Sequence, residues 1–153
     1  MSRTYIFGIG SPFGADRIGW QVIHQLRAHF VDRPDVILET LSQPTNIFIH
    51  TFEATDRIIF IDAMISGRAP GSLEPFTARQ LESASPRLSS HGIDLKTTVE
   101  LLIGMGFLPN QIIVMGIEVT PDGCAFLKEA QSGFAKTKFV VDSWLASQEQ
   151  HIS

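Results

Sequence analysis

The sequence contains a single cysteine, Cys124, and this excludes an internal disulfide bond. No apolar run approaches the roughly 18 residues that a membrane-spanning helix needs, because charged or polar residues interrupt each candidate. The first residues lead directly into a strand-like run instead of the apolar stretch of a signal peptide. We therefore expect a soluble protein of the cytoplasm that has no membrane partner.

Positive charge is also scarce. The chain has 12 Lys and Arg against 16 Asp and Glu, a net charge of -4, and its cations are scattered along the sequence. This excludes the basic patch that binding to nucleic acid needs. With 153 residues and 44% hydrophobic content, the chain is long enough to bury one full core and leaves little for a second. We expect one globular domain over residues 1–153, whose partner is a protein or a small molecule.

Two common hydrolase motifs are missing. Ser11 directly follows Gly10, so the sequence has no G-x-S-x-G nucleophile elbow, and it has no H-E-x-x-H zinc motif. These absences exclude serine hydrolases of that kind and zinc metalloproteases. Four of the five histidines are expected to be surface or core-edge residues: His24, His29, His50 and His151.

Strand-like and helix-like segments alternate along the chain. Short apolar runs predict strands at residues 5–10, 36–38, 57–61 and 112–117, with an edge strand at 72–76. Apolar residues at helical spacing predict helices at residues 17–30, 46–52, from 94 to about 104, and around 139–145. Such alternation implies parallel strands with crossover helices. We predict an α/β fold, a three-layer α/β/α sandwich around a mainly parallel twisted sheet of about five strands.

The glycine-rich turn after the first strand has two interpretations. Gly8, Gly10 and Gly14 are reminiscent of the dinucleotide fingerprint G-x-G-x-x-G, and Glu39 at the end of the second strand would suit a ribose. However, the third glycine comes one residue too late, and Asp16 would repel a phosphate. The alternative is a tight strand-to-helix turn that simply requires glycine.

Asp16, Asp62 and His91 are the candidate site residues, because each follows or opens a predicted element where open α/β folds place ligands. Taken singly, Asp16 could cap the helix at 17–30, Asp62 could be a hydrogen-bonded loop carboxylate, and His91 a polar loop residue. We also expect the nearby helix N-terminus to disfavour the imidazolium form of His91. Together, two carboxylates and an imidazole suit a borderline divalent metal such as Ni, Mn or Zn, with open positions.

The order of four segments resembles the [NiFe]-hydrogenase maturation endopeptidases, which remove a C-terminal extension from the hydrogenase large subunit. The likeness extends from about Tyr5 to Pro121. It rests on residues 8–20 (GIGSPFGADRIGW), residues 61–63 (IDA) with Pro70-Gly71, residues 90–95 (SHGIDL) and residues 114–118 (VMGIE).

This resemblance implies a peptide-bond hydrolase whose metal-contacting residues fall on Asp16, Asp62 and His91. These would recognise nickel in the immature large-subunit precursor, so that the metal arrives with the substrate and the free protease needs no tightly bound metal of its own. Cleavage would follow nickel insertion. Two other functions are left open: a non-catalytic nickel-dependent checkpoint protein, and a Rossmann-like nucleotide-binding protein.

The chain departs from the family pattern in its turn and in its crevice wall. The family usually has Asn where Ser11 stands and two successive acids where Ala15-Asp16 stand, with one residue more in that turn. Its frequent Asp-Gly-Gly-Thr is replaced here by residues 39–43 (ETLSQ). These departures bear on the choice of substrate more than on the class of activity.

Overall fold

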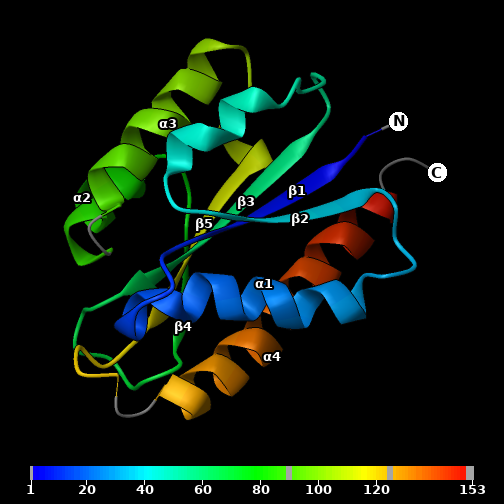
Figure 1. Cartoon of the computed structure of the whole chain (residues 1–153). Helices are drawn as coiled ribbons and strands as arrows, with labels where there is room; N and C mark the ends of the chain where they lie inside the picture. The colour runs from blue at the N-terminus through cyan, green and yellow to red at the C-terminus, as the bar shows by residue number, and fades with distance from the viewer. Residues whose placement is uncertain (1, 89–90, 124–125, 151–153) are drawn as a thin grey trace.

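The computed structural model describes residues 2–88, 91–123 and 126–150. Cys124, Ser90 and His151 lie outside the described residues. A five-stranded sheet in the order β2-β1-β3-β5-β4 forms the centre of the molecule (Figure 1). Its strands are β1 (Thr4–Ile9), β2 (Val36–Leu41), β3 (Arg57–Met64), β4 (Leu73–Phe76) and β5 (Ile112–Glu118). All neighbouring pairs are parallel except β4 and β5, so the predicted, mainly parallel sheet is confirmed. β4 is the predicted edge strand, and the structure shows that it runs antiparallel to β5.

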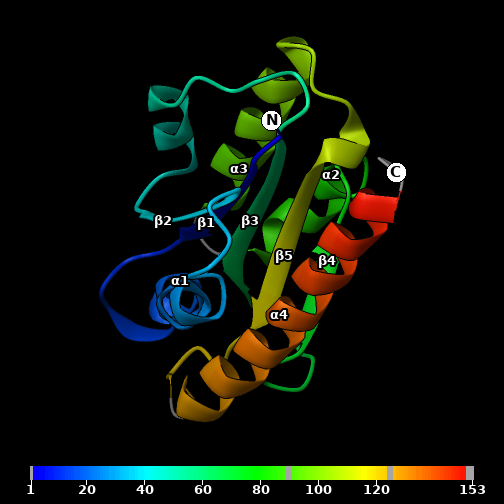
Figure 2. The same ribbon diagram turned by 90° about the vertical axis from the view of Figure 1, so that its right-hand side faces the viewer.

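Helices cover both faces of the sheet, as the three-layer prediction requires (Figures 1 and 2). One face is covered by α1 (Ile18–His29) and α4 (Phe126–Gln150), and the other by α2 (Leu81–Ala84) and α3 (Gly92–Gly104). Four 3-10 helices connect these elements: η1 (Gly14–Arg17), η2 (Pro44–Ile49), η3 (Ser85–Arg87) and η4 (Pro109–Gln111).

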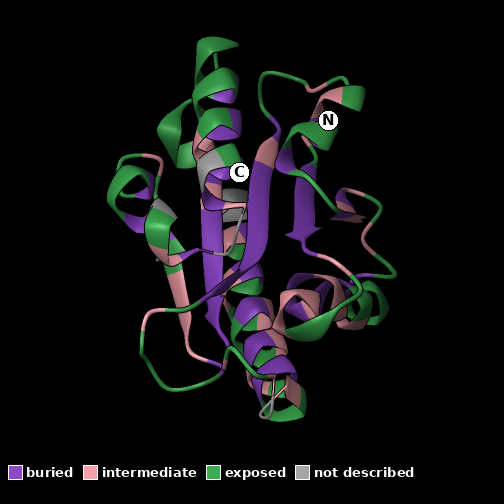
Figure 3. Cartoon of the chain, turned by 60° about the vertical axis from the view of Figure 1, so that its left-hand side comes forward, coloured by how far each residue is buried: buried purple, intermediate pink, exposed green. Residues whose placement is uncertain are grey.

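Two apolar clusters, one on each face, hold the layers together, and the central strands β1, β3 and β5 are almost wholly buried (Figure 3). β3 is buried along seven of its eight residues, as expected for a central parallel strand. Alternate side chains point to opposite faces. Ile59 and Ile61 pack with α1 and α4, whereas Phe60 and Met64 belong to the cluster with α3. Asp62 therefore lies on the face of α3.

The glycines of the first turn allow α1 to approach β1 closely. A Cβ atom on Gly8 would lie 2.3 Å from the carbonyl oxygen of Gly19, and one on Gly10 would lie 2.3 Å from that of Asp16. Gly14 has a positive φ of 59°. The tight-turn interpretation accounts for all three glycines.

Several predicted element boundaries were wrong. β3 continues past the apolar run to Met64, because Asp62 pairs with Gly116 and Met64 with Glu118 in the ladder with β5. The helix predicted at residues 46–52 is a 3-10 helix at Pro44–Ile49. α3 begins at Gly92 rather than at residue 94, and the closing helix begins at Phe126 rather than near residue 139. No described helix is both long and apolar enough to cross a membrane.

Candidate active site

The chain brings Asp16, Asp62 and His91 together from three different elements. Asp16 lies in η1 between β1 and α1, Asp62 lies near the carboxyl end of β3, and His91 immediately precedes α3. The chain leaves β1 for a helix on one face and reaches α3, on the other face, after β3. This places the three residues at the point where open α/β sheets bind ligands.

These three side chains, here called the trio, are close enough to share one ion. Each offers a ligand atom, and the three atoms all lie within 4.8 Å of one another. The Nδ1 atom of His91 is 3.6 Å from Oδ1 of Asp62 and 3.9 Å from Oδ1 of Asp16. Among the described residues, no other group of three or more His, Cys, Asp or Glu side chains has this geometry.

Burial differs sharply within the trio. The side chain of Asp62 is fully buried, that of His91 is 13% exposed and that of Asp16 is 28% exposed. The backbone N–H of Ala63 donates a 2.8 Å hydrogen bond to Oδ1 of Asp62, which fixes this carboxylate against its own strand. The trio is therefore anchored at Asp62 and accessible from the side of Asp16.

The two carboxylates raise the pKa of His91. The largest cause is its hydrogen bond with Asp62; burial opposes the shift, and the charges of Asp62, Asp16 and Asp94 add to it. We expected the helix N-terminus to disfavour the imidazolium. The shift of the His91 pKa runs in the other direction, and its causes are the neighbouring carboxylates. In the metal-free protein the trio favours a proton on His91.

Asp16 does not cap α1. The N-cap position is held by Arg17, no side-chain hydrogen bond caps the helix, and Asp16 lies one residue earlier, within η1. Capping of α1 therefore does not explain why an aspartate stands at position 16. Its place in η1 is set by the close approach of Gly10 and by the hydrogen bond from the N–H of Ser11 to the carbonyl of Asp16 (3.3 Å).

Glu39, which kept the nucleotide interpretation open, has a different partner. Its carboxylate lies 2.8 Å from Nε2 of His50, so its partner is a side chain of the protein instead of a ribose. Since Gly8 and Gly10 are covered by α1 and η1, their backbone is not presented to a phosphate. His50 is partly buried, while His24 and His29 are exposed, as predicted for these histidines.

A scan against family models decides the family. The model described as hydrogenase maturation protease (HycI) matches residues 20–124, which is more than half of the chain. The chain belongs to the hydrogenase maturation protease family. It is therefore a maturation endopeptidase, a hydrolase of peptide bonds, and the predicted family and enzyme class are confirmed.

Solved structures of other maturation proteases share the fold. The maturating endopeptidase HybD from E. coli is 15% identical, with a TM-score of 0.69 over 92% of this chain and 93% of that one. HybD from Thermococcus kodakarensis is 19% identical, with a TM-score of 0.66 over 93% and 98%. HycI from T. kodakarensis KOD1 is 20% identical, with a TM-score of 0.65 over 92% and 90%. A search of curated proteins by sequence found no match.

Glu118 has a structural role that the sequence of this maturation protease did not indicate; there it is only the last residue of the motif at 114–118. Glu118, at the carboxyl end of β5, is 2% exposed. Its carboxylate accepts hydrogen bonds from the backbone N–H of Ser66 (2.9 and 3.2 Å) and from its hydroxyl. Glu118 thus fixes the loop that follows β3, four residues beyond Asp62. This role of Glu118 depends on Ser66, which lies 52 residues away in the sequence, so no local sequence signal indicates it.

The altered crevice wall is also fixed to the core. The carbonyl of Leu41 accepts hydrogen bonds from Nε1 of Trp20 (2.9 Å) and from the N–H of Gly10 (3.0 Å). The end of β2 is thereby joined to α1 and to the turn that leads to Asp16. The sequence differs from the family pattern here, yet the segment is hydrogen-bonded to α1 and to the turn after β1.

Proposed function

We propose that this maturation protease removes the C-terminal extension of a [NiFe]-hydrogenase large-subunit precursor after nickel has been inserted. The precursor's nickel is recognised by Asp16, Asp62 and His91. The observation that carries this proposal is the convergence of three ligand atoms within 4.8 Å at the sheet's switch point. It agrees with membership of a family that matures hydrogenases.

The chemistry of the trio suits a metal that arrives with the substrate. Two carboxylate oxygens and one imidazole nitrogen are acceptable ligands for nickel, and a three-ligand set leaves positions for the precursor's own ligands. The exposed side of Asp16 offers the approach, while buried Asp62 gives a fixed point. Contact with nickel holds the scissile peptide bond in one orientation near the carboxylates.

The attacking water is activated either by nickel acting as a Lewis acid or by a carboxylate acting as a general base. Asp16→Asn separates these routes, because the amide oxygen still offers a metal ligand but is not basic. If this variant binds nickel-loaded precursor and does not cleave it, the Asp16 carboxylate is the base. Retained cleavage by this variant and also by Asp62→Asn assigns the activation to nickel.

The main experiment incubates purified protein with nickel-loaded and nickel-free precursor and measures the product by gel shift and mass. We expect loss of a C-terminal peptide from the loaded form alone. Asp16→Ala, Asp62→Ala and His91→Ala, each shown to be folded, should abolish it, whereas exposed Asp32→Asn and His24→Gln should not. If all three alanine variants still process the precursor, the site assignment is wrong. Binding of precursor by the wild type without any product would instead support the checkpoint function.

A further inference from the structure

An open groove follows the junction of α1 with the start of α4, two helices that lie side by side (Figures 1 and 2). Its volume is about 940 Å³. Its first lining residue, Arg17, directly follows Asp16 in η1. The described residues that line it come from both sides: Arg17, Gln21 and Gln25, then Gly123, Phe126, Leu127, Lys128, Ala130 and Gln131.

Arg17 is held in a fixed orientation at the head of this groove. Its guanidinium lies 4.0 Å from the centre of the Phe126 ring, and its Nε atom donates a 2.8 Å hydrogen bond to the carbonyl of Gly14. A guanidinium stacked on an aromatic ring keeps its remaining N–H groups at its edge, in the planar arrangement that matches a carboxylate. Arg17 is therefore positioned in advance as an anion-binding residue.

The groove is positive in a protein whose net charge is -4. Arg17 and Lys128 are its two charged lining residues, and neither has an ion-pair partner within the described part of the chain. The nearby acid Glu129 is fully buried, and its carboxylate accepts a hydrogen bond from the N–H of Thr120. No acid is among the described lining residues; Asp16 and exposed Asp122 adjoin Arg17 and Gly123 in the chain but lie outside the lining, so the charge inside the groove favours an acidic ligand.

The rest of the lining suits the backbone of an extended peptide. Gln21, Gln25 and Gln131 offer amide groups that both donate and accept hydrogen bonds. The side-chain oxygen of Gln25 is buried and has no hydrogen-bond partner in the described structure.

We infer that this groove binds the C-terminal extension of the precursor, with Arg17 and Lys128 contacting carboxylates of that peptide. The inference rests on the proposed function, which supplies such a peptide next to Asp16. The extension ends in a free carboxylate whatever its sequence, so at least one anionic group is available to the two cations. The groove thus selects the departing peptide by charge, separately from the recognition of nickel by the trio.

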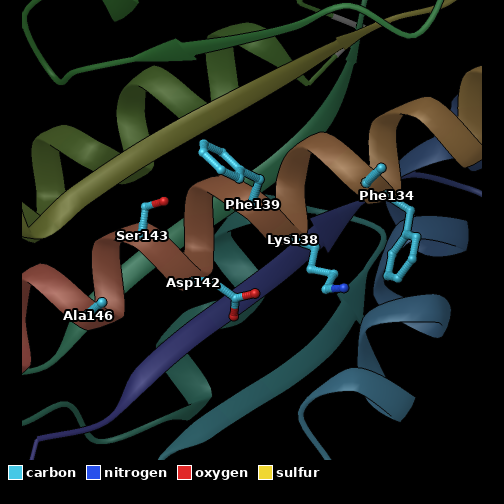
Figure 4. Close-up of a pocket in the computed structure, with 7 residues that line it drawn as sticks. Phe134, Lys138, Phe139, Asp142, Ser143 and Ala146 are labelled. Atoms are coloured by element: carbon cyan, nitrogen blue, oxygen red, sulfur yellow. The ribbon is translucent and has the colours of Figure 1, made fainter.

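The test uses the full protein without metal and a fluorescein-labelled synthetic peptide of Glu, Ser and Gly with a free carboxyl end. Fluorescence anisotropy should show binding that weakens with salt. Arg17→Gln/Lys128→Gln should bind it about fivefold more weakly, since two exposed ion pairs are lost. The matched control is Arg27→Gln/Lys138→Gln, which removes one cation from α1 and one from α4. Lys138 lies in a separate cavity of α4 (Figure 4), and neither control residue lines the groove.

Unchanged binding in the Arg17/Lys128 variant, an equal loss in the control, or tighter binding of an oligothymidylate than of the peptide would each overturn the inference. A companion peptide has Gln in place of Glu and an amidated end. The wild-type protein should bind this neutral peptide as weakly as the Arg17→Gln/Lys128→Gln variant binds the acidic peptide. Peptide binding is read without nickel and without cleavage. Failure of the proposed function would therefore appear in the precursor assay alone, and failure of this inference in the peptide assay.

Discussion

The Nδ1 atom of His91 lies 3.6 Å from Oδ1 of Asp62, a carboxylate with no solvent exposure. One residue precedes α3 and the other lies in β3, so packing of that helix on the sheet creates the pair. The contact raises the pKa of His91 and gives the buried charge of Asp62 a partner. The same two side chains are proposed to meet nickel, which would replace the proton between them.

Asp62→Asn should lower the pKa of His91 in the metal-free protein, because it removes the charge and the hydrogen bond that raise it. The measurement is an NMR titration of the His91 ring signals in both proteins. A raised folded-state pKa contributes stability that is fully present below the unfolded value of 6.5 and is lost as pH rises through the folded value. The wild type should therefore lose this stability across that window, and the variant should lose less. Identical His91 titration in both proteins would show that the contact is absent in solution.

Gly8→Ala should destabilise the protein by about 3 kcal/mol, because the added Cβ would lie 2.3 Å from the carbonyl oxygen of Gly19 and force α1 away from β1. Urea unfolding followed by circular dichroism measures the change. Gly104→Ala is the control: nothing lies within 4 Å of its Cβ position at the end of α3, so it should be neutral or stabilise by up to about 1 kcal/mol. Equal stability of the Gly8 variant and the wild type would contradict the close packing of these elements.

Glu118→Gln should lower the free energy of unfolding by about 2 kcal/mol, because hydrogen bonds from Ser66 to a carboxylate become weaker bonds to an amide. Ser66→Ala removes the hydroxyl bond and keeps the backbone one, so its cost should be smaller, about 1 kcal/mol. Chemical denaturation of the two single variants and the double variant gives the coupling energy. Additive effects would mean that these residues do not act together.

Asp35→Asn should alter the dependence of stability on pH. Hydrogen bonds from the Arg33 guanidinium (2.9 and 3.0 Å) lower the pKa of Asp35, chiefly through that side-chain contact. A depressed carboxylate pKa contributes stability above the unfolded value of 3.8 that is lost as pH falls through the folded value. The pair is near the surface, so the wild type should exceed the variant by less than about 1 kcal/mol at pH 7. Urea midpoints at pH 2 to 7 should converge at the acid end, while exposed Asp32→Asn should show no such trend.

Local pattern was sufficient for most elements and failed at particular places. The polar residue Asp62 ended the apolar run, so β3 was predicted to stop before it, but backbone pairing with β5 continues through Met64. The hydrogen bonds of a ladder join backbone groups and do not depend on side-chain polarity. The end of β3, in contrast, was predicted from the polarity of Asp62. The start of α4 was missed for a related reason. Its first turns contact α1 as well as the sheet, and that burial is not visible in local spacing.

The chemistry of the side chains was enough to identify the candidate residues, but which of them contact one another depends on the fold. The sequence indicated Asp16, Asp62 and His91 because carboxylates and imidazole are metal ligands and stand at element ends. Capping by Asp16 and a neutral His91 were equally reasonable from local context. The N-cap position of α1 is held by Arg17, and the carboxylates beside His91 raise its pKa, neither of which local context indicates.

The sequence by itself determined the alternation of strands and helices, the parallel sheet, the family and the three candidate ligands, because these follow from periodicity, residue type and motif order. Only the tertiary structure decided that Glu39 pairs with His50, that Glu118 holds Ser66, and that Arg17 stacks on Phe126. The contacts of Glu118 and Arg17 join segments that are distant in the chain, whereas Glu39 and His50 are 11 residues apart on either side of η2. Their geometry depends on how helices pack on the sheet, which no local pattern encodes.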